Sequence, residues 1–207
     1  MTQERLLETA LDQFGRLGFD GASTREIARA SGTSMSSITY HFGGKEGLYL
    51  ACAHHITEQI RLRQAGAIRL AREAPSLGRE ELLERLLAVI DDVALMMLHE
   101  DSAAWSCFIV REQQQPTQAF ELLYSGVMEE MLEGVEAAIG RIRPELASRE
   151  IRALALTLFG QVLVLRAARA TVCRALGVAR LGEEEGALLR SQIRTNSLAI
   201  LTGGTQS

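Results

Sequence analysis

The 207-residue chain has little of what disulfide-bonded, membrane-spanning or β-rich proteins need. Its three cysteines are dispersed, which argues against a disulfide framework and for a reducing cytoplasm. Its three prolines leave long stretches with a 3.6-residue hydrophobic period, which predict an all-α fold. The longest apolar run, LALTLFGQVLVL at 154–165, is too short to span a membrane, and the N-terminal TQERLLETAL lacks the apolar core of a signal peptide. We therefore expect a soluble cytoplasmic protein with no membrane partner.

Motifs for catalysis, metal binding and cofactor binding are also missing. The sequence contains no glycine-rich phosphate loop, no GxSxG and no HExxH. The adjacent His54 and His55 would point about 100° apart on a helix, and His41, His99 and the cysteines have no ligand spacing. We therefore expect no enzyme activity, no metal and no cofactor.

The net charge of −4 does not by itself suggest a nucleic-acid partner. The charge is unevenly distributed, however. Residues 1–72 carry nine Lys and Arg against seven Asp and Glu, whereas residues 73–207 carry 13 against 19. A small basic surplus, doubled in a dimer, suffices for a few phosphate contacts. The near-neutral N-terminal part also keeps an alternative open, in which the chain binds a small molecule or a partner helix and has lost affinity for DNA.

The segment TREIARASGTSMSSITYHFGGKEGLY, Thr24 to Tyr49, predicts two short helices with a tight turn between them and the start of a third. Ala28 allows the two helices to approach closely, Gly32 fits a turn with positive φ, and Ile38 packs into the corner. This spacing is typical of the helix-turn-helix, whose second helix enters the DNA major groove. Thr24 and Ser34 are the expected N-caps of its two helices.

The outward face of this motif carries groups that hydrogen bond to DNA. The short side chains of Ser36, Ser37 and Thr39 can approach base edges or the thymine methyl group. The longer side chains of Tyr40, His41 and Lys45 are expected to contact phosphates. The free N–H groups at the start of the next helix, which begins at Lys45, also attract a phosphate.

The rest of the chain predicts long helices and two domains. A helix-turn-helix domain over residues 1–46 is expected to join a larger helical domain over residues 47–207. The expected helices, bounded by glycines and prolines, are 3–17, a short helix between the Thr24 cap and the turn at Gly32, then 35–41, 45–73, 79–99, 103–114, 117–141, 147–176 and 183–201.

The chain resembles the TetR family of bacterial transcription regulators. The runs GFDGASTREIARASG and ITYHFGGKEGLY carry this resemblance over about residues 3–50, and the total length also fits. The runs at 108–124 and 160–177 are similar to the CecR-like subgroup. The resemblance implies a ligand-responsive repressor, a homodimer that a small-molecule effector releases from an inverted repeat of double-stranded operator DNA. The positions that it implies at the DNA are Thr24, Arg25, Ser34, Ser36, Ser37, Thr39, Tyr40, His41 and Lys45.

The effector is expected to contact polar side chains inside apolar helical runs, with aromatic rings as walls. An alternative reading gives these residues structural roles. The aromatics would then belong to the core, and Arg111 or Arg166 would pair with Glu112 or Glu121. The candidate effector residues are Trp105, Phe108, Arg111, Glu112, Phe120, Tyr124, Gln161 and Arg166.

The last two long helices are the expected dimer interface, as a four-helix seam with two-fold symmetry. The alternative is that their apolar stripes cover only the core of their own domain. The stripes comprise Ile151, Leu154, Ala155, Leu158, Val162 and Leu165 on one helix, and Leu188, Ile193, Leu198 and Leu201 on the other.

Overall fold

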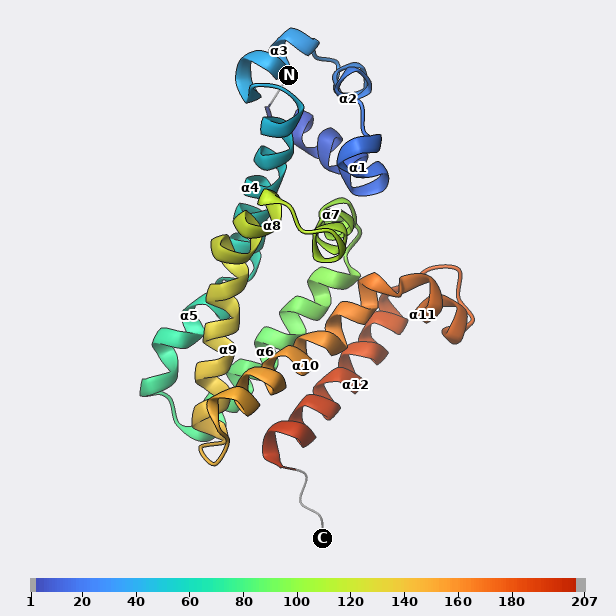
Figure 1. Cartoon of the computed structure of the whole chain (residues 1–207). Coiled ribbons are helices and arrows are strands. Elements are labelled where there is room, and N and C mark those ends of the chain that lie inside the picture. The colour runs from blue at the N-terminus through green and yellow to red at the C-terminus, as the bar shows by residue number, and fades with distance from the viewer. Residues whose placement is uncertain (1–2, 204–207) are drawn as a thin grey trace. The chain divides into compact units, whose positions relative to one another are not determined.

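A computed structural model describes residues 3–203 of the chain, and every secondary-structure element in this range is a helix (Figure 1). This confirms the predicted all-α fold class. The chain forms two compact units: one contains residues up to Arg61 together with Asp101–Met128, and the other contains Leu62–Glu100 and the chain from Glu129 onward. The unit that contains the helix-turn-helix extends beyond residue 46. The predicted domain boundary between residues 46 and 47 stays a prediction.

The first unit is built on helix α1, which packs against α2 and α7. Gly18, with φ of 77°, interrupts the helical geometry near the C-terminal end of α1. This break brings Phe19 back toward Phe14 and Tyr49, and the ring centroids of Phe19 and Tyr49 lie 5.1 Å apart. The helices of this unit are α1 (Gln3–Gly21), α2 (Thr24–Ser31), α3 (Met35–Phe42), α4 (Lys45–Arg63), α7 (Ala103–Gln114), α8 (Gln118–Leu123) and the π-helix Tyr124–Met128.

Two glycines and one serine set the geometry of the helix-turn-helix. Gly32 ends α2 and Gly43 ends α3, with φ of 71° and 75°. Ser34 caps α3 as predicted, because its Oγ accepts a hydrogen bond of 3.1 Å from the Ser37 N–H. The predicted Thr24 cap is wrong: the cap position of α2 is Ser23, whose side chain makes no capping bond.

Three predicted helices are interrupted. The predicted helix 45–73 breaks at Gln64 (φ −109°, ψ 27°), so that a separate α5 (Ala65–Glu73) follows α4. The predicted helix 147–176 breaks at Ala168 into α10 (Ser148–Ala167) and α11 (Arg169–Leu176), which are bent by 78°. The predicted helix 117–141 consists of α8, the π-helix and α9 (Glu129–Ile142).

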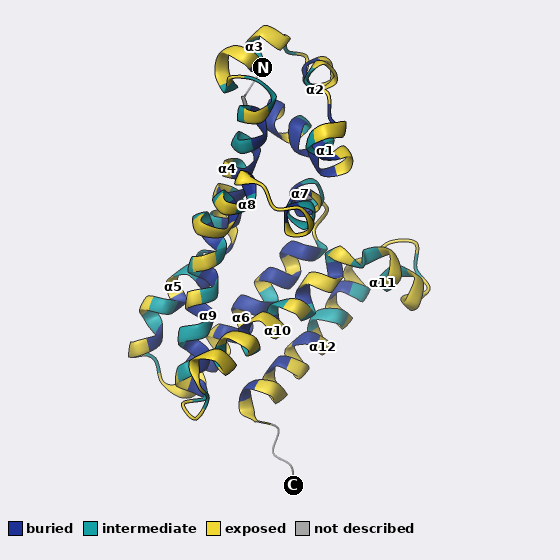
Figure 2. Cartoon of the chain, in the orientation of Figure 1, coloured by how far each residue is buried: buried dark blue, intermediate teal, exposed yellow. Residues whose placement is uncertain are grey.

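In the second unit, α6 (Arg79–Leu98) packs against α10 and α12 (Glu183–Thr202), while α5 packs against α9. The inward faces of these helices are buried and their outward faces are exposed (Figure 2). Ion pairs of Arg190 with Asp91 and of Arg194 with Glu84 join α12 to α6. The short 3₁₀ helices Ala74–Ser76 and Glu100–Ser102 flank α6.

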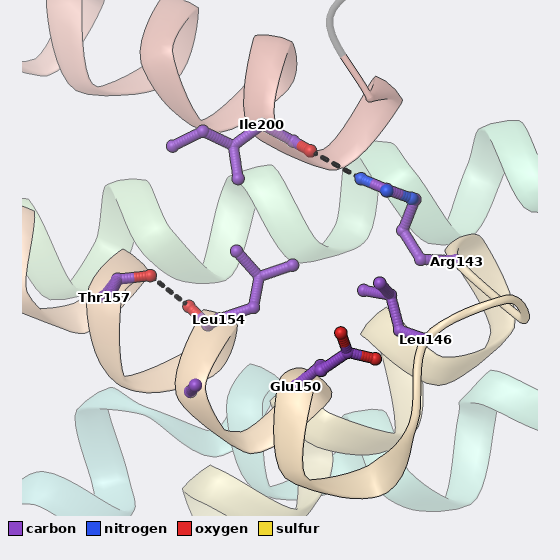
Figure 3. A pocket seen from close by; sticks show the side chains of 7 residues that line it. Arg143, Leu146, Glu150, Leu154, Thr157 and Ile200 are labelled. Carbon is purple, nitrogen blue, oxygen red and sulfur yellow. Dashed lines mark hydrogen bonds between the residues drawn. The ribbon is translucent and has the colours of Figure 1, made fainter.

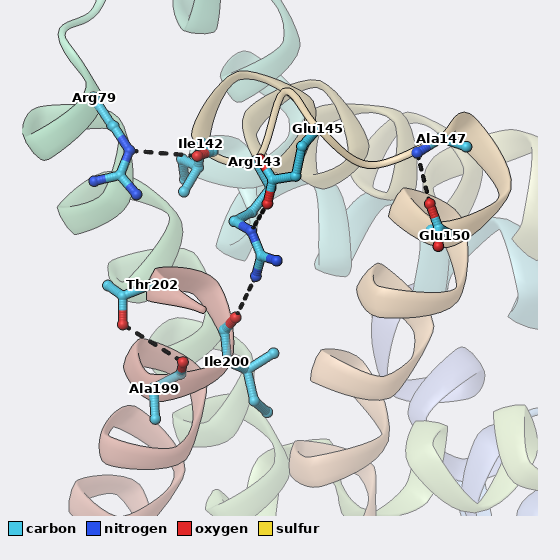
Figure 4. A network of polar contacts seen from close by, with 9 residues as sticks. All are labelled: Arg79, Ile142, Arg143, Glu145, Ala147, Glu150, Ala199, Ile200 and Thr202. Carbon is cyan, nitrogen blue, oxygen red and sulfur yellow. Dashed lines mark hydrogen bonds and ion pairs between the residues drawn. The ribbon is translucent and has the colours of Figure 1, made fainter. Parts of the chain in front are cut away.

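Hydrogen bonds at one end of this unit tie its helix termini together (Figure 4). The Arg79 Nε–H donates to the Ile142 carbonyl at 3.3 Å, and the Arg143 guanidinium donates to the Ile200 carbonyl at 2.9 Å. By length and composition, no single helix in residues 3–203 qualifies as a membrane span, although the bent pair α10 and α11 qualifies when taken together.

Candidate nucleic-acid interface

Helix α3 presents a polar outer face that is well suited to a DNA groove. Its single buried residue is Ile38, which anchors the helix to the unit. Tyr40 exposes 84% of its surface, and Ser36, Thr39 and His41 are exposed beside it. The nine predicted DNA-contact residues all lie in or beside α2, α3 and α4 of the first unit. Among these nine, Arg25, Ser34, Ser36, Thr39, Tyr40 and His41 are exposed, and Thr24, Ser37 and Lys45 are half-buried.

The hydroxyl groups on α3 are partly engaged within the helix. Ser34 Oγ caps the helix and also lies 2.8 Å from Ser36 Oγ and 3.2 Å from Ser37 Oγ. The Thr39 hydroxyl donates to the Met35 carbonyl at 3.1 Å. A hydroxyl that donates inside the helix keeps its acceptor lone pairs. The exposed Thr39 side chain therefore keeps an acceptor and a methyl group available for contacts outside the helix.

Lys45 is held at the first position of α4. Its Nζ lies 4.8 Å from the centroid of the Phe19 ring and donates to the Asp20 carbonyl at 3.3 Å. The cation–π contact and the hydrogen bond restrict a side chain that otherwise has many rotamers. A positive charge is thereby fixed next to the N-terminus of α4, where backbone N–H groups favour an anion.

The eight predicted effector residues are divided between the two units. Trp105, Phe108, Arg111, Glu112, Phe120 and Tyr124 lie in the first unit, while Gln161 and Arg166 lie on α10 of the second. Their role as effector contacts stays a prediction.

Two of these residues bind helices of the same unit. The Arg111 guanidinium donates to the carbonyls of Gly15 and Arg16 at the end of α1, at 3.5 and 3.2 Å, and makes no ion pair with Glu112 or Glu121. The Glu112 carboxylate is 1% exposed and accepts a 2.7 Å hydrogen bond from the Tyr49 hydroxyl.

Four of the other candidates, and Phe108 with them, contact further residues of the same unit. The rings of Phe120 and Tyr124 stack with centroids 5.9 Å apart. On α10, Gln161 Nε2 donates to Ser197 Oγ at 3.5 Å, and the Arg166 guanidinium donates to the His99 carbonyl. Phe108 is fully buried against Tyr49, with ring centroids 4.5 Å apart.

A pocket of about 380 Å³ lies elsewhere in the second unit, between α10 and the end of α12 (Figure 3). Its polar groups already have partners: Glu150 accepts from the Ala147 N–H at 2.8 Å, and the Thr157 hydroxyl donates to the Leu154 carbonyl at 2.8 Å. What remains is mostly apolar surface. None of the predicted effector residues is among its lining, which comprises Arg143, Leu146, Glu150, Ala153, Leu154, Thr157 and Ile200.

The apolar stripes predicted for the dimer largely cover the core of their own unit. Most of their members are buried in a single copy of the chain, namely Ala155, Leu158, Val162, Leu165, Ile193 and Leu201. The predicted stripe is therefore corrected. Two predicted members, Leu188 and Leu198 on α12, are exposed, and so are apolar side chains outside the predicted stripes: Leu156, Leu163 and Val164 on α10, and Ile200 on α12.

Both halves of the chain match known families. Residues 6–52 match the family of bacterial regulatory proteins named tetR, and residues 82–204 match the C-terminal domain of the HTH-type transcriptional dual regulator CecR. The chain belongs to the TetR family of helix-turn-helix transcriptional regulators. Within that family it carries the CecR-type C-terminal domain. It is similar to the dual regulator CecR of Shigella flexneri, with 31% identity over 99% of this chain and 93% of that protein.

Solved structures support the fold. AibR in complex with isovaleryl coenzyme A and operator DNA has a TM-score of 0.68 and 16% identity, covering 96% of this chain and 97% of its own. FadR of Bacillus subtilis in complex with stearoyl-CoA has a TM-score of 0.65 and 12% identity, covering 99% and 100%. At these identities the likeness establishes the shared helical architecture.

Proposed function

We propose that this regulator binds an inverted-repeat operator as a homodimer, represses transcription, releases the DNA when a small molecule binds, and has no enzyme activity. The observation that carries the proposal is the outer face of α3. Tyr40 exposes 84% of its surface there, beside Ser36 and Thr39, while Ile38 fixes the helix from behind. An exposed aromatic and short hydroxyl side chains on a capped helix are suited to phosphates and base edges.

Ligand response is supported by the solved relatives, because AibR binds isovaleryl coenzyme A together with operator DNA and FadR binds stearoyl-CoA. In our proposal, residues 1–46 read the DNA and residues 47–207 bind the effector and dimerise. The candidate contacts are the aromatic residues Trp105, Phe108, Phe120 and Tyr124 with Gln161 and Arg166. The hydrogen bonds of Arg111 and Glu112 favour a different role, which is argued below.

The dimer proposal rests on two exposed stripes with the heptad spacing of a helix bundle. On α10, Gly160 lies at the middle of its stripe, and a Cβ atom there would meet no atom within 4 Å in a single copy. Such open space suits a second helix at close range. The exposed stripes are Ala153, Leu156, Gly160, Leu163 and Ala167 on α10, and Leu188, Ser191, Thr195, Leu198 and Thr202 on α12.

Selection of binding sites from a random duplex library tests the function directly. We expect one sequence to be enriched and to bind at least about 10³-fold more tightly than a shuffled duplex. Its affinity should fall as salt concentration rises, because lysine and arginine contacts release counterions. Absence of enrichment, or equal binding to the shuffled duplex, would contradict DNA reading and favour a helical interaction protein. Release of the selected duplex by isovaleryl coenzyme A or stearoyl-CoA is the first test for an effector.

A further inference from the structure

A buried carboxylate in the first unit is bound entirely by neutral donors. The Glu112 carboxylate, near the end of α7, accepts from the Tyr49 hydroxyl at 2.7 Å, from the Thr117 N–H at 3.0 Å and from the Thr117 hydroxyl at 2.9 Å. Thr117 Oγ1 in turn accepts from the Ala119 N–H at 3.1 Å and so caps α8. These bonds join α4, the end of α7 and the start of α8.

In the hydrogen bond between Tyr49 and Glu112, the tyrosine is the donor. Burial, as the larger cause, and the hydrogen bond to Glu112, as the second, raise the pKa of Tyr49 well above its ordinary value, so the phenol stays protonated and donates. Glu112 has no ion-pair partner within the described part of the chain. A buried carboxylate without a cation depends on its hydrogen bonds, and loss of one donor leaves an acceptor unsatisfied.

Contacts continue from Tyr49 to the predicted DNA face. The Tyr49 ring meets the Phe19 ring edge-on at 5.1 Å, and Lys45 Nζ lies over that same Phe19 ring at 4.8 Å. Tyr49 and Lys45 are also four residues apart on α4 and share one helix face. An unbroken series of contacts therefore runs from Thr117 through Glu112, Tyr49 and Phe19 to Lys45.

We propose that Glu112 and Tyr49 are positioning residues for DNA binding, which hold Phe19 and thereby place the Lys45 ammonium at a phosphate. This role rests on the proposed function, and it gives Glu112 a part in the DNA-binding unit in place of an effector contact. Arg111 also helps to position Phe19, because its guanidinium ties α7 to the part of α1 just before Phe19.

The test uses the full-length protein and the duplex obtained by selection. Tyr49→Phe removes the hydroxyl that ties the ring to Glu112, so the ring is held less firmly against Phe19, and because it retains a buried aromatic ring it should fold even if Glu112→Gln does not. We expect Tyr49→Phe to weaken binding about 2- to 30-fold, the range for residues that act on a binding site through intervening contacts. We also expect it to reduce the salt slope by up to about one counterion, because the Lys45 contact is loosened.

Lys45→Ala gives the decisive comparison. If Tyr49 acts through Lys45, Tyr49→Phe should cause little further loss of affinity in the Lys45→Ala background. Gln113→Ala, an exposed neighbour of Glu112, is the matched control and should leave affinity and slope unchanged. Thermal melting of each variant gives the temperature below which it is folded, and binding is measured at a temperature where every variant is folded.

The outcomes separate the two proposals. If the wild-type protein binds no duplex selectively, the proposed function and this inference both fall. If the wild-type protein binds and Tyr49→Phe leaves affinity and salt slope unchanged, only the inference is overturned. A Tyr49→Phe loss that adds in full to the Lys45→Ala loss also overturns it, because the two residues then act independently.

Discussion

Tyr40 is held in place by its helix and has little to do with the stability of the fold. It is 84% exposed, and its ring lies 5.0 Å from that of His41. We expect Tyr40→Ala to change the free energy of unfolding by less than about 0.5 kcal/mol. Binding should weaken by a similar factor on all DNA sequences, because a phosphate contact does not discriminate among bases. Fluorescence anisotropy with operator variants measures this; a loss confined to one base pair would give Tyr40 a base-reading role instead.

Thr39 should behave in the opposite way. Its hydroxyl donates within the helix, so an acceptor and a methyl group face outward. Thr39→Ala should change the preference at one base pair by about 1–3 kcal/mol and leave binding elsewhere in the operator unaffected. Equal weakening on every operator variant would show that Thr39 reads no base.

At the residue scale, one of the two local caps was predictable from the sequence and distant partners were not. The Ser34 cap was confirmed, and its partner lies three residues away, whereas the cap predicted at Thr24 falls one residue earlier, at Ser23. Arg111 and Glu112 stood out as polar residues beside an apolar run. Their partners Arg16 and Tyr49, however, lie 95 and 63 residues away in the chain. Only the packing of α7 against α1 and α4 brings such groups together.

At the scale of the element, the turn between α3 and α4 depends on Gly47. A Cβ atom at Gly47 would lie 1.7 Å from the Phe42 carbonyl oxygen, a backbone atom that cannot move without opening the turn. We expect Gly47→Ala to destabilise the first unit by at least about 3 kcal/mol and to abolish DNA binding. Chemical denaturation followed by circular dichroism measures the loss.

Gly21→Ala is the matched control in the same unit. Its Cβ would have ordinary contact, 3.4 Å from the Leu17 Cβ, and alanine favours a helix over glycine. We expect the free energy of unfolding of Gly21→Ala to equal that of the wild type or to exceed it slightly. If Gly47→Ala is as stable as Gly21→Ala, the close approach of the two helices is wrong.

Element ends marked by glycine were predictable, whereas the breaks inside long helices were not. Gly32 and Gly43 adopt positive φ and end their helices at the predicted turns. Gln64 and Ala168 break helices although neither is glycine or proline, and neither residue type signals an end. Their conformations come from tertiary packing, which overrides local propensity.

At the scale of the whole molecule, burial distinguishes core from interface on α10 and α12. Both helices carry apolar residues on more than one face, so periodicity could not separate the face toward α6 from the face left exposed. Gly160→Arg tests the exposed face. The single copy has room for the side chain, so the fold should persist while two copies can no longer approach.

Sedimentation at micromolar concentration should find wild type as a dimer and Gly160→Arg as a folded monomer. Ala88→Arg places the same side chain on an exposed position of α6 and should remain dimeric. A Gly160→Arg variant that is still fully dimeric would move the interface away from α10.

In the proposed complex, two copies of this chain read DNA with two α3 helices. Hydroxyl-radical footprinting of the wild-type protein on its selected operator would show where both helices bind. We predict two symmetric protected patches on one side of the duplex, with centres at least one helical turn, about 34–36 Å, apart. A single asymmetric patch protected by a monomer, or no protection beyond that of a shuffled duplex, would contradict it.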